Sequence, residues 1–243
     1  MKIGFSVRNL QEESFSAIND EVKNGRLTLS GMRGYLIGLF FLSGILVGVS
    51  LFVANASTIG WNTLSTGWHR IYYIEAVLFG FHLLILLLCL GNNGFSQKLL
   101  SIGMVLFTYK AALDPFLPVL MFSKDEGNYH LFLPLIIVIL ISGFVLHIII
   151  LIKWIKSLKQ NKEKSTKKRG TNFIGVTLVL FPLITLTTII TKNGLLGDYD
   201  LLFGTSIMTI IYLGLLIAAC EFIIATYCIF RFPSFSVKKV VRK

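Results

Sequence analysis

The chain has 243 residues, of which 54% are hydrophobic and only 14% are charged, and its mean hydropathy is +0.75. Soluble domains carry about 25% charged residues, so this composition excludes an ordinary soluble protein and predicts one membrane domain. The net charge of +11 does not indicate a nucleic-acid partner, because the basic residues flank apolar segments, a pattern typical of topology signals and contact with anionic lipids.

The N-terminal segment, residues 1–33, is expected to form an amphipathic cytoplasmic lead-in. Its apolar residues recur every three to five positions among charged ones, which favours a helix that lies on the membrane surface or packs under the membrane domain. It lacks the apolar core and small-residue cleavage site of a secretory signal, so we expect it to remain in the mature protein.

Residues 34–230 predict an all-α fold, a polytopic integral membrane bundle of six transmembrane helices. Each apolar segment has about the 20 residues that a helix needs to cross a bilayer. The predicted segments are 34–54, 71–90, 99–122, 131–155, 172–191 and 201–230, and a basic tail follows at 231–243.

Six crossings place both termini on one side, and the basic residues indicate which side that is. The lead-in holds five basic residues, the connection 153–169 holds eight and the tail holds five, whereas the opposite side has Arg70, Lys124 and Lys192. By the positive-inside rule both termini are predicted to be cytoplasmic. The abundance of Lys, Ile and Phe and the scarcity of Cys favour a bacterial plasma membrane.

The first predicted span carries two glycine pairs, Gly34 with Gly38 and Gly44 with Gly48. Small residues four apart let a second helix approach closely, so this span predicts a homo-oligomer. The alternative is that these glycines only reflect the higher frequency of glycine in membrane helices.

The most informative stretch is 109–118, which places a cation, an anion and two prolines inside an apolar run. Lys110 and Asp114 are four residues apart, so on a helix they share one face and can pair. An unpaired charge at this depth costs roughly 3 kcal/mol on insertion scales. Pro115 removes the helical donor for the carbonyl of residue 111, which adds a second polar feature.

Four other ionisable residues fall within predicted spans: Glu75, His82, His147 and Glu221. Our hypothesis is that they line a polar intramembrane path centred on Lys110 and Asp114. The alternative is a structural clasp, with the histidines bonded to nearby backbone and Glu221 paired with His147 or Lys110 as packing glue. For Glu75, which is predicted to lie one turn below the outer surface, an ordinary interfacial carboxylate is the preferred interpretation.

No cofactor or metal is predicted, and the chain is not predicted to be an enzyme. The histidine spacings do not return to one helix face, which disfavours a two-haem arrangement. Cys89, Cys220 and Cys228 show no ligand spacing, and Ser206 has no base or oxyanion donor specified by the sequence. Neither HExxH nor a glycine-rich phosphate loop occurs, so any energy for transport comes from a partner or an ion gradient.

In plan, the chain resembles the permease subunits of small export-type ABC transporters. The shared features are a cytoplasmic lead-in, six spans, both ends inside and no ATPase in the chain, and they imply transport with a separate ATP-binding subunit. The short loop 192–200 departs from the extra outer element that such permeases often carry. A second hypothesis is a non-transporting membrane accessory, immunity or assembly protein, in which the ion pair clasps helices or recognises another membrane protein.

Overall fold

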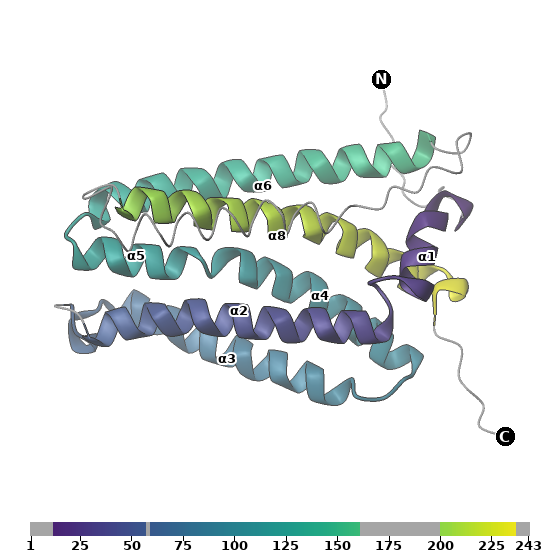
Figure 1. Ribbon diagram of the computed structural model, residues 1–243, viewed down its shortest axis with the longest axis horizontal. Helices are drawn as coiled ribbons and strands as arrows, with labels where there is room; N and C mark the ends of the chain where they lie inside the picture. Colours follow the sequence, from purple (N-terminus) through teal and green to yellow (C-terminus); the bar gives the residue numbers. More distant parts are fainter. Residues whose placement is uncertain (1–11, 57–58, 161–199, 237–243) are drawn as a thin grey trace.

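The structure is a computed structural model that describes residues 12–56, 59–160 and 200–236. This part of the chain is helical and contains no strand, and long helices lie side by side in an elongated bundle (Figure 1). The long helices are α2 (Leu29–Ala56), α3 (Thr66–Leu88), α4 (Gly94–Leu113), α6 (Tyr129–Gln160) and α8 (Asp200–Arg231), and the shorter α5 (Phe116–Asp125) extends α4.

Five helical stretches of the described chain are long and apolar enough to cross a membrane: Leu29–Asn55, Thr66–Leu88, Gly94–Asp125, Tyr129–Leu158 and Asp200–Arg231. They correspond to five of the predicted segments, and the remaining one, 172–191, lies outside the described residues. The outward faces of these helices carry large apolar side chains, such as Phe52 on α2 (71% exposed) and Val77 on α3 (71% exposed). Since such faces suit lipid better than water, the described fold indicates a membrane protein.

The third predicted span is continuous in its course but broken in its hydrogen bonding. Helix α4 ends at Leu113 and α5 begins at Phe116, so the break falls at Asp114 and Pro115. Proline lacks the N–H that would continue the helical ladder, which explains the position of the break. The Asp114 N–H still bonds to the Lys110 carbonyl over 3.1 Å, so the two charged side chains stay on one helical turn.

The lead-in packs against one end of the bundle. A 3-10 turn, η2 (Glu12–Phe15), and helix α1 (Ser16–Asn24) precede α2. The Phe15 side chain is 1% exposed and lies between the rings of Tyr227 and Phe232, at centroid distances of 6.2 and 5.6 Å. The described part of the lead-in therefore contacts the end of the bundle through a buried aromatic side chain.

Successive long helices along the chain, α2, α3, α4 and α6, alternate in direction (Figure 1), but α6 and α8 run parallel. His147 contacts Leu216 and Cys220, and Tyr212 bonds to the carbonyl of Leu140, so residue numbers rise together along the two helices. Gln160 and Asp200 therefore lie at opposite ends of the bundle (Figure 1).

Candidate functional site

Lys110 is buried where α2, α3 and α4 meet, near the middle of the span Gly94–Asp125. Its Nζ atom lies 2.6 Å from Ser43 Oγ, 2.9 Å from Asp114 Oδ2 and 2.5 Å from Glu75 Oε2. The predicted pair of Lys110 and Asp114 is thus present, with side-chain exposures of 5% and 1%. We call Ser43, Glu75, Lys110 and Asp114 the charged cluster.

Lys110 contacts the other three members of the charged cluster. Its ammonium group donates hydrogen bonds to Ser43 Oγ and Asp114 Oδ2, and it forms an ion pair with Glu75 Oε2, which has no hydrogen-bond partner among the described residues. The ring of Phe79, one turn along α3 from Glu75, adds a cation–π contact with its centroid 4.2 Å from Nζ. Lys110 therefore lies between two carboxylates and an aromatic face.

Glu75 belongs to this cluster, which differs from the interfacial position preferred from the sequence. The reason is the start of the helix: α3 begins at Thr66, five residues before the predicted segment. At 1.5 Å per residue, Glu75 lies about 14 Å along the helix from its first residue. Its side chain is 13% exposed, and the ion pair with Lys110 is its main charge contact.

The two oxygens of the Asp114 carboxylate differ in their surroundings. Oδ2 accepts hydrogen bonds from Lys110 and from the Ser43 hydroxyl. Oδ1 is buried and has no hydrogen-bond partner among the described residues. An unpartnered buried oxygen is costly, and more so when it carries charge.

His82 lies beside the charged cluster, on α3, and is 1% exposed. Its ring stacks on Phe107 of α4, with centroids 3.8 Å apart and planes 10° from parallel, and meets Phe40 edge-on. Neither ring nitrogen has a hydrogen-bond partner among the described residues. His82 therefore packs as a neutral aromatic side chain.

His147 forms a separate polar group with α4 and α8. Its Nδ1 atom lies 2.8 Å from the Leu216 carbonyl and 3.3 Å from Cys220 Sγ, and its Nε2 atom lies 2.6 Å from the Tyr109 hydroxyl. A carbonyl oxygen only accepts, so Nδ1 carries the hydrogen and Nε2 is free to accept from Tyr109. The structure thus gives His147 partners other than Glu221.

Glu221 is not brought to the charged cluster. Its carboxylate receives both bonds of Arg26 Nη2, over 2.6 Å to Oε1 and 2.5 Å to Oε2. Arg26 precedes α2, so this ion pair joins the lead-in to α8. The sequence-based pairing of Glu221 with His147 or Lys110 is wrong, because the lead-in folds back and supplies a closer cation.

Sequence reasoning also missed Ser43, which bridges Lys110 and Asp114. A lone serine in an apolar helix usually donates to its own backbone one turn back, so the presence of a serine does not by itself indicate a functional site. Its position near the middle of its span, as for Lys110, was the one available indication.

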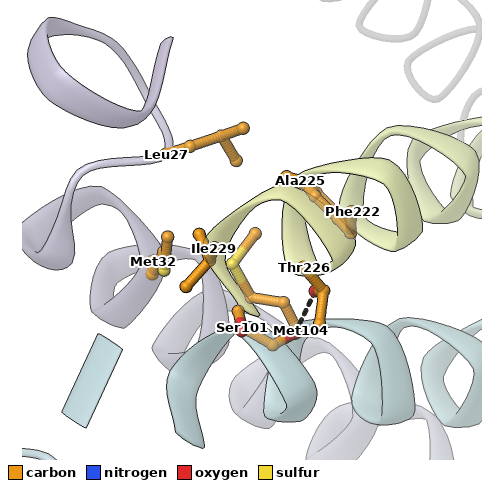
Figure 2. A pocket seen from close by; sticks show the side chains of 8 residues that line it. All are labelled: Leu27, Met32, Ser101, Met104, Phe222, Ala225, Thr226 and Ile229. Atoms are coloured by element: carbon orange, nitrogen blue, oxygen red, sulfur yellow. Dashed lines mark hydrogen bonds between the residues drawn. The ribbon is translucent and has the colours of Figure 1, made fainter. Parts of the chain in front are cut away.

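A small pocket lies at the end of the bundle near the lead-in, away from the charged cluster (Figure 2). Leu27 and Met32 face α4 and α8 across it, and the Thr226 hydroxyl donates to the Ser101 carbonyl over 3.0 Å. Its lining carries no ionisable side chain. Within the described residues, no group of three or more His, Cys, Asp or Glu side chains has the arrangement of a metal site.

No protein-family model, curated protein or solved structure matches the chain. The five apolar helical spans place it in the class of multi-spanning membrane proteins. Any more specific function has to be argued from the charged cluster itself.

Proposed function

We propose that the protein is a transport-type, permease-like membrane subunit with the charged cluster as its polar intramembrane site. The observation that carries the proposal is the burial of Glu75, Lys110 and Asp114 together near the middle of two apolar spans. Ionisable groups at this depth are costly and characteristically mark ion or substrate paths in membrane proteins. A clasp would need only one cation and one anion, whereas this cluster holds a second carboxylate.

The chain supplies no nucleotide site, so the proposed energy source is a separate ATP-binding subunit or an ion gradient. We also do not propose an enzymatic role, because the sequence specifies no nucleophile with a base and an oxyanion donor. The proposed location is a bacterial plasma membrane, where the basic connection 153–169 contacts anionic lipids.

The proposed topology has six crossings, with both termini cytoplasmic. Support comes from the parallel course of α6 and α8, which puts Gln160 and Asp200 at opposite ends of the bundle. The apolar segment 172–191 is long enough for such a crossing.

A homo-oligomer through α2 is part of the same proposal. A Cβ atom placed on Gly34, Gly38 or Gly48 meets no described atom within 4 Å, apart from α2 itself and the immediate chain neighbours. This face therefore lets a helix of a second copy approach closely.

A second candidate is a non-transporting accessory, immunity or assembly protein. It is favoured by the contacts of Lys110 with Ser43 on α2 and Glu75 on α3, which tie α2, α3 and α4 together as a clasp would.

A variant that neutralises the whole cluster separates the two candidates. In Glu75→Gln/Lys110→Met/Asp114→Asn no charge stays buried, and replacing a complete buried ion cluster by neutral groups is often tolerated. We expect this variant to fold and to lose activity. The assay is pull-down in mild detergent, followed by ATP hydrolysis of the recovered complex in proteoliposomes. A folded variant with full activity, or a wild-type protein that brings down only a non-ATPase membrane partner, would favour the accessory role.

A further inference from the structure

We propose that the charged cluster binds one proton, held by the carboxylate pair Glu75 and Asp114. This inference rests on the proposed function, because it names the ligand of the same site. It starts from a charge count: two carboxylates surround one ammonium group, so the cluster would carry a net charge of −1 if all three were ionised. A net charge buried at mid-bilayer is costly, and one added proton removes it.

Lys110 does not supply the missing positive charge, because its ammonium group is already included in the count. The Ser43 hydroxyl is neutral and donates to Asp114 Oδ2. The charged groups acting on Asp114 among the described residues are Lys110 and Glu75. On α8, Glu221 is engaged by Arg26 towards the lead-in.

His82 is the remaining titratable side chain beside the cluster, and it is a poor proton acceptor there. Its ring stacks on Phe107 and meets Phe40 edge-on, so it packs among aromatic side chains that offer no counter-ion to an added positive charge. The proton therefore goes to the carboxylates.

Two buried carboxylate oxygens of the cluster have no hydrogen-bond partner among the described residues, Asp114 Oδ1 and Glu75 Oε2. Asp114 Oδ2 accepts two hydrogen bonds, which keeps that oxygen an acceptor, whereas Oδ1 is buried and unpartnered. Protonation converts a carboxylate into a neutral carboxyl group, and no other bond changes. Because the two carboxylates share one ammonium group, the proton belongs to the pair rather than to either residue alone.

The test is infrared difference spectroscopy of the full-length protein in lipid, read at the carbonyl stretching band of a protonated carboxyl group. Wild-type protein at neutral pH is expected to show the band, with release of one proton per molecule as the band disappears at higher pH. In Glu75→Gln or in Asp114→Asn, one carboxylate remains opposite Lys110, the cluster is neutral, and the band is lost. In Glu221→Gln, the matched control outside the cluster, the band is kept.

Three results would overturn the inference: no band in wild-type protein, a band that survives in either cluster variant, or a band removed by Na⁺ at constant pH. If a variant does not fold, the wild-type titration alone decides between one released proton and none. A proton in the cluster of a protein that recovers no ATP-binding partner leaves the inference standing and removes only ATP-driven transport. Recovery of an ATP-binding partner with a cluster that holds no proton overturns the inference and leaves the proposed transport role standing.

Discussion

Replacing Lys110 with methionine removes the one cation of the charged cluster and leaves two buried carboxylates facing each other. Breaking a buried ion pair by removing one partner costs about 3–5 kcal/mol. Lys110 contacts Glu75 at 2.5 Å and Asp114 at 2.9 Å, and Asp114 is 1% exposed. We therefore expect the free energy of unfolding at neutral pH to fall by an amount in that range.

The same variant gives a pH dependence with a definite sign. The carboxylates of Lys110→Met relieve their repulsion by taking up protons, so the folded state binds more protons than the unfolded state. Stability then falls as pH rises and recovers as pH is lowered, by up to about 1.4 kcal/mol per pH unit for each extra proton.

The measurement is thermal unfolding in mild detergent across acidic to neutral pH, followed by circular dichroism. Lys98→Met is the matched control, because it removes an exposed lysine near the start of the same helix, whose described contact is a cation–π contact with Phe230. We expect the control to stay within about 0.5 kcal/mol of wild-type protein. A Lys110→Met protein as stable as the control, or one whose deficit does not shrink in acid, would refute the reasoning.

Three further predictions concern the ends of the bundle. Arg33→Ala removes the hydrogen bonds to the carbonyls of Cys89 and Gly91, which follow α3. We expect thermal unfolding to show a free energy of unfolding lower by about 1–3 kcal/mol, against little change for Lys98→Met. A double-mutant cycle of Arg26→Ala and Glu221→Gln should give a coupling of only about 1 kcal/mol, because the Arg26 side chain is 44% exposed; a value near 3 kcal/mol would contradict that screening. With an impermeant thiol reagent on intact cells, Glu126→Cys should be labelled and Asn92→Cys only after permeabilisation; the opposite result would reverse the proposed orientation.

Much of the helical plan could be predicted from hydrophobicity alone, because span length and apolarity are local properties of the chain. The break at Pro115 and the pairing of Lys110 with Asp114 were also predictable, since both follow from residues on one helical turn. The start of α3 was harder. Tyr72 and Trp68 pack among other aromatic side chains and are buried, so the helix begins well before the purely aliphatic run.

Contacts between helices could not be predicted, because they depend on rotation and depth rather than on spacing. Glu75 reaches Lys110 only because α3 presents Glu75 and Phe79 to α4 on one face. Glu221 was assigned to the wrong partner for the same reason. Arg26 was counted as a topology signal, yet the fold of the lead-in brings it to α8.

The lead-in is synthesised early in translation, whereas α8, the helix it packs against, is synthesised near the end. Arg26 and Glu221 are 195 residues apart, which at about 5–20 residues per second corresponds to a delay of roughly 10–40 s on the ribosome. Phe15 and Val22, both buried in the finished protein, have no partner on α8 during that interval. The lead-in therefore lacks its contacts with α8 until the last helix is inserted, and truncation of that helix would leave Phe15 and Val22 without them.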